Sequence, residues 1–300
     1  MKRLIVVFNP QSSRYDKVRQ EVIDRLKNLK GYLIGKYEVA PTNLDDNITK
    51  LSNLLKDGDL VISAGGDATG IIASNAVLKS GKDATLSALP YGNFNDLART
   101  LGTKSLDDII FGETRELYPL EIYMDGKFFR YSTCYTTIGM TAAATHIYDS
   151  PKMRTKLKKG LGRGIGSYTN LAGWYFKNRR KHVFIPEFTL NGMPVARKTS
   201  DYVAVNGRYM ARVMKGREDY RDSGYFRSTT DYLVNFFRLS KYMARSIISR
   251  IPGSLTTDDT LEFKNPSNVI IQTEGESYRC KNISKIEIKK SKTRLKVIEN

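Results

Sequence analysis

The first 110 residues alternate between short apolar runs and segments whose apolar residues recur at helical spacing. The apolar runs predict buried strands over residues 4–8, 33–39, 60–63 and 84–89. Between these runs, apolar residues three or four positions apart predict helices over 18–29, 44–55, 68–79 and 95–101. Repeated strand–helix units imply a parallel sheet covered by helices on both faces. The sequence therefore predicts an N-terminal three-layer α/β domain.

The pattern changes near residue 116. Strand-like runs cover 117–124 and 128–138, and Asp125-Gly126 between them favours a hairpin turn. More strand patterns follow at 261–263, 269–272, 283–288 and 295–298. Strands without regular intervening helices predict a C-terminal β-rich domain, antiparallel and sandwich-like. We expect an α/β domain over 1–122 and the β-rich domain over 123–300, and the last strand could return to the first domain.

The net charge points to a polyanionic partner. The chain has 49 Lys and Arg against 31 Asp and Glu, a formal charge of +18. Nucleic acid, an anionic membrane surface and a phosphorylated small molecule all fit such an excess. The absence of a recognised nucleic-acid module argues against nucleic acid, so no such partner is expected.

The densest positive charge lies in residues 150–182, which hold ten Lys and Arg and no Asp or Glu. Trp174, Tyr175 and Phe176 lie in this stretch, and such rings favour the membrane interface. We expect the stretch to dock on an anionic membrane surface; the alternative is an ordinary solvated basic helix. No apolar run is long enough to span a bilayer, and the two distant cysteines argue against a disulfide framework. The expected location is cytoplasmic, with peripheral membrane association.

Three polar segments each follow a predicted strand. They are Asn9-Pro10-Gln11-Ser12-Ser13, Gly65-Gly66-Asp67-Ala68-Thr69-Gly70 and Pro90-Tyr91-Gly92-Asn93-Phe94-Asn95-Asp96. The carboxyl ends of parallel strands share one rim of the sheet, where ligands of open α/β folds bind. We therefore expect the three segments to lie together.

The second segment suits a polyphosphate. Two glycines let the backbone approach phosphate oxygens, and the following helix supplies free N–H groups. A carboxylate beside phosphates is repelled, so Asp67 makes sense as a Mg²⁺ ligand or as a base for the attacking hydroxyl. The simpler alternatives are that Asp67 and Asn95 only cap helices.

Taken together, the segments resemble the diacylglycerol kinase catalytic-domain family, which includes bacterial lipid kinases and sphingosine-kinase-like enzymes and belongs to the NAD kinase superfamily. The family's Asn-Pro-x-Ser-Gly, Gly-Gly-Asp-Gly-Thr and Pro-x-Gly-Thr-x-Asn-Asp-x-x-Arg are similar to the segments that begin at Asn9, Gly65 and Pro90. Glu274-Gly275-Glu276 stands where the family has Asp-Gly-Glu, and Asp222-Ser223-Gly224 where it has an Asp-Gly turn.

The resemblance implies an ATP- and Mg²⁺-dependent lipid kinase that transfers the γ-phosphate to the hydroxyl of diacylglycerol or a related lipid alcohol. It implies catalytic roles for Asp67 and Glu274, either of which could be the base. It assigns metal or structural roles to Asp96 and Asp222. It assigns cofactor-binding roles to Asn9, Gly65, Gly66, Thr69, Asn95 and Glu276.

Some positions depart from the family pattern. Ala68 replaces a glycine, and if that position needs a positive φ the alanine costs about 1–2 kcal/mol. Asn93 replaces a hydroxyl residue, Phe94 a small residue and Ser13 a glycine. These departures leave open a catalytically weak relative that binds nucleotide or lipid. A NAD kinase-like enzyme also stays open, because that family shares the Gly-Gly-Asp loop. A homodimer also stays open.

Overall fold

The computed structural model describes most of the chain. The described residues are 2–12, 15–27, 29–92, 95–148, 185–195, 199–210, 214–215, 220–231, 237, 241, 244–245, 251 and 253–300. The basic stretch 150–182, expected to dock on a membrane, lies outside the described residues, as do Ser13, Asn93 and Phe94. Among the described helices, none is long and apolar enough to cross a bilayer.

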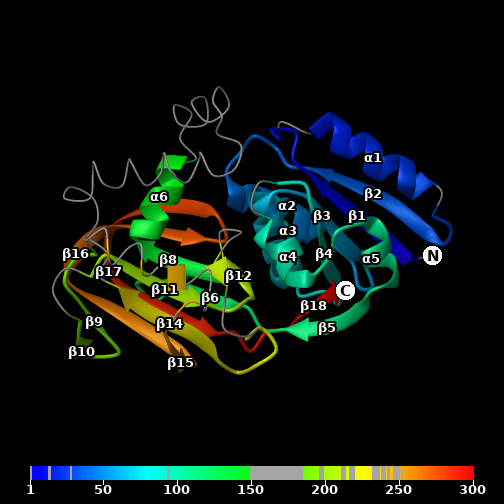
Figure 1. Cartoon of the computed structure of the whole chain (residues 1–300). Helices are drawn as coiled ribbons and strands as arrows, with labels where there is room; N and C mark the ends of the chain where they lie inside the picture. The colour runs from blue at the N-terminus through cyan, green and yellow to red at the C-terminus, as the bar shows by residue number, and fades with distance from the viewer. Residues whose placement is uncertain are drawn as a thin grey trace.

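The N-terminal half is built on a six-stranded sheet, sheet A (Figure 1). In spatial order its strands are β2 (Tyr32–Glu38), β1 (Lys2–Phe8), β3 (Leu60–Gly65), β4 (Thr85–Pro90), β18 (Leu295–Glu299) and β5 (Glu113–Leu117). The pairs from β2 to β18 are all parallel, and only β5 runs antiparallel to its neighbour. The predicted parallel sheet is confirmed.

Helices cover both faces of sheet A. They are α1 (Tyr15–Lys27), α2 (Leu44–Leu54), α3 (Asp67–Ser80), α4 (Asp96–Leu101) and α5 (Leu106–Phe111). Alternate residues of β1 separate the two sides, because Leu4 and Val6 pack with α1 and α5 whereas Ile5 and Val7 pack with α2 and α3. This confirms the three-layer α/β architecture.

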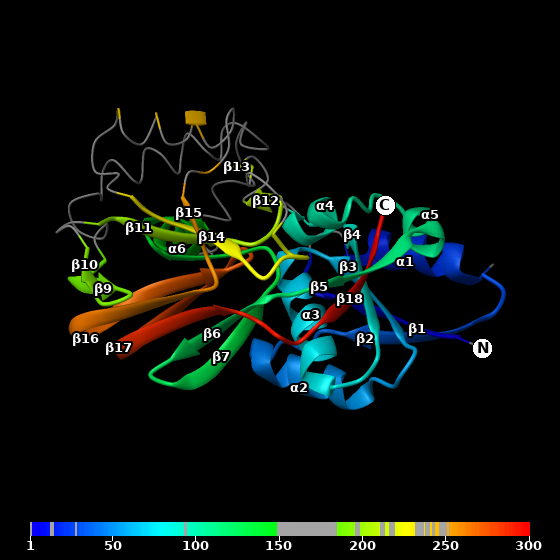
Figure 2. The same cartoon turned by 90° about the horizontal axis from the view of Figure 1, so that it is seen from below.

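The C-terminal half contains a ten-stranded antiparallel sheet, sheet B (Figure 2). The main path runs through β15 (Ser254–Thr256), β14 (Phe226–Asp231), β11 (Asp201–Val205), β8 (Tyr135–Gly139), β16 (Asp258–Thr273), β17 (Glu276–Lys290), β6 (Leu120–Met124) and β7 (Lys127–Ser132). Strands β9 (Phe188–Leu190) and β10 (Met193–Pro194) branch from β16; β12 (Tyr209–Met210) pairs separately with β13 (Met214–Lys215), and α6 (Met140–Tyr148) follows β8.

Strands from distant parts of sheet B share one core. Ile122 of β6, Ile288 of β17, Tyr202 of β11 and Phe226 of β14 belong to the same buried cluster. A sheet whose distant strands meet in this way must curl on itself, which gives the expected sandwich-like β-rich half.

Several strand boundaries differ from the sequence prediction. The run 117–124 is divided at Tyr118-Pro119, so that β5 joins sheet A and β6 joins sheet B. The run 128–138 is also divided, at Thr133-Cys134, between β7 and β8. In contrast, the runs 261–263 and 269–272 are parts of the single strand β16, which accommodates register shifts between them. Helices α5 and α6 were not predicted.

The hairpin expected at Asp125-Gly126 is confirmed. Met124 of β6 pairs with Lys127 of β7, which leaves a two-residue loop, and Asp125 and Gly126 have φ of 48° and 77°. Two positive φ values at the central positions define the turn whose twist matches antiparallel strands. The last strand, β18, pairs with β4, so the C-terminus returns to sheet A.

Candidate active site at the carboxyl rim of sheet A

Segments after β1, β3 and β4 carry the polar motifs, as the sequence predicted. Asn9 follows β1 and forms a turn, in which its Oδ1 accepts a hydrogen bond from the Gln11 N–H at 2.9 Å. Gly66 precedes α3, and no side chain caps this helix start. The first N–H groups of α3 therefore have no side-chain acceptor at the cap and point toward the rim, where an anion is stabilised.

The loops after β3 and β4 touch through glycines. A Cβ on Gly65 would clash with the Thr69 hydroxyl, and a Cβ on Gly92 would overlap the Cα of Gly66. Thr69 is fully buried, and its hydroxyl makes no hydrogen bond to any residue that the structure describes. The glycines thus let two backbone segments approach more closely than any side chain would allow.

Asn95 locks the loop after β4 from within. Its backbone is left-handed, with φ of 57°, which asparagine tolerates better than most residues. The side chain accepts from the Gly92 N–H at 2.5 Å and donates to the Gly92 carbonyl at 2.9 Å. The structure therefore places Asn95 as the internal brace of the loop.

Asp67, the first residue of α3, connects the two loops. Its Oδ1 accepts from the Asp96 N–H at 2.8 Å and its Oδ2 accepts from the Asn95 N–H at 3.3 Å. Burial and the nearby charge of Asp96 raise the pKa of Asp67 well above its ordinary value, although the two backbone donors act in the opposite direction. The site thus favours a proton or a cation at Asp67.

Asp96 is fully buried at the start of α4. The Tyr135 hydroxyl donates to Asp96 Oδ2 at 3.0 Å, and Gln272 Nε2 lies 3.4 Å from the same hydroxyl. Tyr135 and Gln272 belong to β8 and β16, so this chain of hydrogen bonds links sheet B to the rim of sheet A.

Glu274 reaches the site on the tight turn between β16 and β17. Glu274 and Gly275 have φ of 47° and 92°, and the neighbouring Thr273 and Glu276 pair across the hairpin. A Cβ on Gly275 would lie 3.2 Å from the Cβ of Asp67. The tip of the hairpin therefore packs directly on the start of α3, and brings together residues 67 and 274.

The Glu274 carboxylate is held by backbone donors. Its Oε1 accepts hydrogen bonds from the N–H groups of Thr133 and Cys134, the latter at 2.6 Å. Burial is nevertheless the larger effect and raises the pKa of Glu274 to about 7, with a smaller contribution from the charge of Asp96. A carboxylate with a pKa near neutrality is well matched to general-base chemistry.

The remaining predicted residues lie at different places. Glu276 begins β17 beside the hairpin tip and is half-buried. Asp222 is exposed, and among the described residues no hydrogen bond or ion pair joins it to Asp67, Asp96 or Glu274. Within the residues that the structure describes, no three His, Cys, Asp or Glu side chains are arranged as a preformed metal site.

The replacement of glycine by Ala68 causes no backbone strain. Ala68 lies in the first turn of α3 and does not have a positive φ. The cost considered from the sequence therefore does not arise.

The sequence did not identify the residues that support the three carboxylates. Tyr135 was hidden in the strand pattern 128–138, where an aromatic residue is typical of a core position. The N–H groups of Thr133 and Cys134 leave no trace in the sequence, because any residue except proline supplies them.

The two facing glycine loops of the α/β domain and the acidic hairpin of the curled antiparallel sheet thus meet at one site. Residues 3–117 match the family model of the diacylglycerol kinase catalytic domain. The resemblance seen in the motifs is therefore confirmed for the N-terminal domain.

Known proteins agree with this assignment. A diacylglycerol kinase of Bacillus subtilis (strain 168) is 29% identical over 172 residues, which cover 54% of this chain and 52% of that protein. The match thus spans about half the length of the curated relative. A structure of a diacylglycerol kinase from Bacillus anthracis str. Sterne superposes over 100% of this chain and 97% of its own, with a TM-score of 0.72 and 17% identity. A second structure from the same organism has a TM-score of 0.68, 17% identity and coverage of 100% and 98%. At such identities these structures show a likeness of fold alone.

Proposed function

We propose that the protein is a lipid kinase, which uses ATP and Mg²⁺ to phosphorylate the hydroxyl of diacylglycerol or a related lipid alcohol. The observation that carries this proposal is that Asp67 and Glu274 meet beside the glycine loops. Asp67 follows strand β3 of sheet A, and Glu274 lies on the hairpin between β16 and β17 of sheet B, so both halves of the protein contribute a carboxylate to the site. Phosphoryl transfer needs positioning and charge neutralisation more than covalent help, and such a site supplies both.

The glycine loops fit the phosphates of a nucleotide. The contact between Gly66 and Gly92 leaves backbone at the surface of the rim, and the uncapped start of α3 adds N–H donors. The buried Thr69 hydroxyl lacks a partner, which a phosphate oxygen or an ordered water would satisfy after a small shift of Gly65. We propose that Asn9, which follows β1, and Glu276, which begins β17, contact the nucleotide.

Glu274 is the better candidate for the base. Both Asp67 oxygens accept backbone hydrogen bonds, whereas the bonds from Thr133 and Cys134 engage a single oxygen of Glu274. A carboxyl group with a pKa near 7 is also partly ionised at neutral pH and, when ionised, is basic enough to accept a proton from a hydroxyl group. We propose that Glu274 takes the proton of the lipid hydroxyl and that Asp67 orders the loops.

Mg²⁺ in nucleotide sites is commonly held by one or two carboxylates together with phosphate oxygens. A preformed cage of three protein ligands is therefore not required, and the donor set of Asp67 and Asp96 suits a hard cation. When bound, the ion would neutralise the phosphate charges. Among the residues that the structure describes, no contact of the exposed Asp222 supports its predicted metal role, and we keep it only as a structural residue of its turn.

A lipid acceptor requires access to a membrane. The proposed docking segment is the basic stretch 150–182, on the strength of its charge and aromatic residues alone. If electrostatics drive the docking, binding to anionic vesicles falls as salt rises and falls again when Lys156, Lys158 and Lys159 are replaced by Gln. Binding that is indifferent to both changes would exclude electrostatic docking.

Phosphate transfer to defined acceptors tests the function. The protein is incubated with Mg²⁺, γ-labelled ATP, NAD and lipid alcohols in anionic vesicles, beside Asp67→Asn and Glu274→Gln. We expect label on a lipid, with losses of about 100-fold or more in both variants. Asp201→Asn is the matched control, because Asp201 is equally buried and its pKa is also raised, to about 8, chiefly by burial, yet it binds Thr141 away from the site.

The other outcomes assign other functions. Label on NAD would make the protein a NAD kinase-like enzyme and reject the lipid assignment. Nucleotide binding without transfer to any acceptor would identify a non-catalytic relative.

A further inference from the structure

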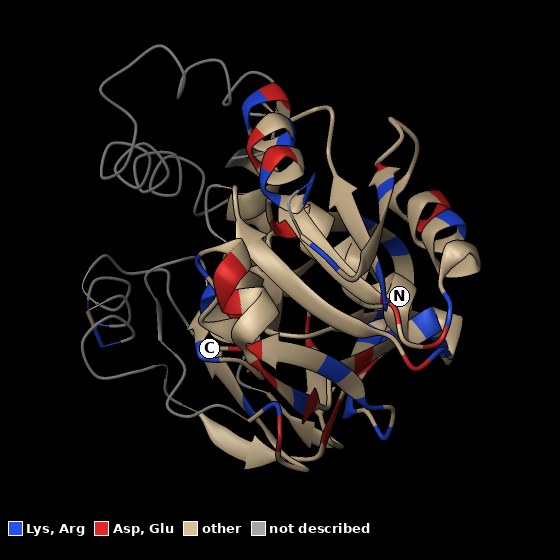
Figure 3. Ribbon diagram, turned by 90° about the vertical axis from the view of Figure 1, so that its right-hand side faces the viewer, with Lys and Arg blue, Asp and Glu red and all other residues tan. Residues whose placement is uncertain are grey.

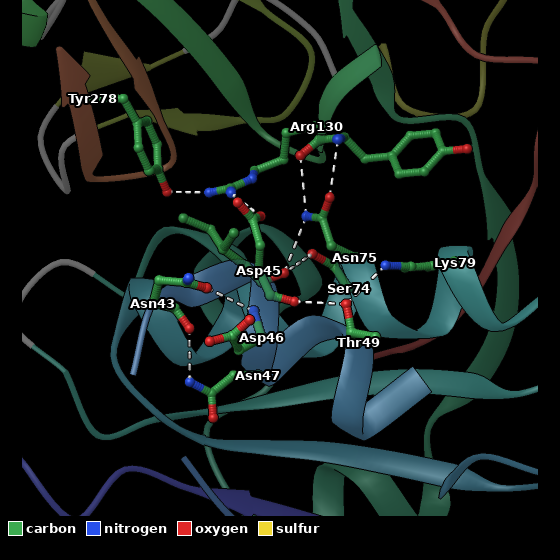
Figure 4. Close-up of polar contacts among 12 residues, drawn as sticks. Asn43, Asp45, Asp46, Asn47, Thr49, Ser74, Asn75, Lys79, Arg130 and Tyr278 are labelled. Atoms are coloured by element: carbon green, nitrogen blue, oxygen red, sulfur yellow. Dashed lines mark hydrogen bonds and ion pairs between the residues drawn. The ribbon is translucent and has the colours of Figure 1, made fainter. Parts of the chain in front are cut away.

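Asn75 connects the helix that begins with Asp67 to the second sheet. It lies eight residues beyond Asp67 on α3 and is only 4% exposed. Its Oδ1 accepts from the Tyr131 N–H at 2.9 Å, and its Nδ2 donates to the Tyr131 carbonyl at 3.1 Å (Figure 4). Nδ2 also donates to the Ile71 carbonyl one helical turn earlier, at 3.0 Å. Both ends of the side-chain amide are therefore engaged.

These bonds attach α3 to an edge strand at a single register. Tyr131 lies on β7, the last strand in the order of sheet B, so no strand among the described residues pairs with its outward N–H and carbonyl. The Asn75 amide takes the place of that strand by offering an acceptor and a donor at matching positions. A shift of β7 by one residue would present the wrong side of the backbone to Asn75.

The same strand leads directly to the Glu274 support. Two and three residues after Tyr131, the N–H groups of Thr133 and Cys134 donate hydrogen bonds to Glu274 Oε1. The adjoining Gly275 packs against Asp67, where α3 begins. A closed path of contacts thus runs from Asp67 along α3 to Asn75, through β7 to Glu274 and back to Asp67; we call this path the ring.

We propose that Asn75 is a positioning residue that, through the ring, holds Glu274 in place relative to Asp67. The inference rests on the proposed function, because it assigns catalytic importance to that spacing. Helix α3 and strand β7 are regular elements with little internal freedom. The hydrogen bonds between the Asn75 amide and Tyr131 therefore influence the distance between Asp67 and Glu274 at the opposite side of the ring. An error of about 1 Å in a reacting geometry can cost about 100-fold in rate.

The neighbouring ion pair between Arg130 and Asp45 is not part of the ring. Arg130 of β7 forms an ion pair with Asp45 of α2 at 2.5 Å (Figure 4). No candidate site residue lies on α2, so this pair joins β7 to a helix other than the one that begins with Asp67. The positioning role therefore belongs to Asn75 and not to the junction as a whole.

The test compares Asn75→Ala and Asn75→Leu with Asn47→Ala. Asn47 is 1% exposed, and its amide also braces backbone, at Ala40 and Asn43, but it lies outside the ring. We expect the Asn75 variants to lower kcat about 10- to 100-fold while KM for ATP changes less than about threefold. Asn47→Ala should lower the melting temperature to a similar extent and leave kcat within about threefold. Unchanged kcat in folded Asn75→Ala would overturn the inference.

Amide hydrogen exchange gives a measurement that needs no activity. In Asn75→Ala we expect the Thr133 and Cys134 amides to exchange at least about tenfold faster, and in Asn47→Ala we expect no change at these positions. If the wild-type protein phosphorylates no acceptor, the proposed function fails, yet exchange still tests the ring. Unaltered protection of both amides in Asn75→Ala would show that Asn75 does not act on the Glu274 support.

Discussion

Gly66 and Gly92 meet backbone to backbone, so that a Cβ on Gly92 would overlap the Gly66 Cα and lie 2.9 Å from Asn95 Oδ1. Both obstacles belong to the loops themselves, and neither is the flexible end of a long side chain. The two loops must therefore separate if Gly92 gains a side chain.

We predict that Gly92→Ala destabilises the protein by about 1–3 kcal/mol, the usual cost of overpacking, and weakens nucleotide binding about tenfold or more. Urea unfolding and nucleotide titration measure the two effects. Gly224→Ala is the matched control, because a Cβ on Gly224 meets nothing within 4 Å and its φ is not positive. A normal nucleotide affinity in Gly92→Ala would show that the glycine contact does not shape the binding surface.

Protonation of Glu274 predicts how stability depends on pH. Its pKa rises from the ordinary 4.5 to about 7 in the folded protein, mainly through burial. Between these values the native state binds more protons than the unfolded state, so stability falls as pH rises. The contribution is fully present below the unfolded pKa and is lost as pH rises through the folded pKa; a shift of this size corresponds to roughly 3 kcal/mol.

Glu274→Gln should remove this part of the pH dependence, as urea midpoints at about pH 5 and about pH 8 would show. The carboxyl groups of Asp67 and Asp201 also have raised pKa values and act in the same direction. The variant should therefore have a flatter profile than the wild type, and a slope should remain. An unchanged slope would mean that Glu274 is charged in the folded protein at all these pH values.

The sequence predicted the layers of the first half because local periodicity reports burial on each face. It could not assign β18 to a partner, since pairing with β4 joins residues that are about 200 positions apart and depends on the whole sheet. Tyr118-Pro119 did carry a usable signal for the break between β5 and β6, because proline has no N–H to donate to a sheet.

For the site, the motifs predicted which loops form it, but not which contacts each side chain makes. Asn95 was expected to touch nucleotide, whereas its amide is committed to Gly92. Glu274 was expected to be a candidate base, yet the hydrogen bonds that Thr133 and Cys134 donate to it depend on where two distant turns meet. Such contacts follow from tertiary packing and leave no periodic pattern in the chain.

The Tyr135 hydroxyl, which donates to Asp96, provides a further test of the site. Tyr135→Phe deletes one hydrogen bond to a buried carboxylate, which costs about 1.5–3 kcal/mol of stability. If Asp96 serves the reaction, kcat should also fall about tenfold, because supporting partners of site carboxylates commonly have effects of this size. Urea unfolding and steady-state kinetics measure the two quantities.

Tyr202→Phe is the control for this variant. Tyr202 is also fully buried and its hydroxyl donates to an aspartate, Asp259, at 2.9 Å, but within the core of sheet B. It should lose similar stability and keep its kcat. Equal kinetic losses in the two variants would indicate a general effect of destabilisation instead of a role for Asp96.

The ion pair between Arg130 and Asp45 is strongly asymmetric, and we predict unequal consequences for its two members. Arg130 is 2% exposed and Asp45 72% exposed. The guanidinium also lies over the rings of Phe129 and Tyr278, at 5.0 and 4.6 Å from their centroids. Removing the arginine therefore removes buried packing at the junction, whereas removing the aspartate removes a solvent-screened charge.

Arg130→Ala should lower the free energy of unfolding by about 2–5 kcal/mol, as for other large buried side chains, and Asp45→Ala by no more than about 1 kcal/mol. Urea unfolding of both single variants and of the double variant measures the coupling. High salt should reduce the effect of Asp45→Ala and leave that of Arg130→Ala almost unchanged, because screening acts on exposed charges. Equal losses in the two single variants would mean that charge pairing, and not burial of Arg130 between aromatic rings, holds α2 against β7.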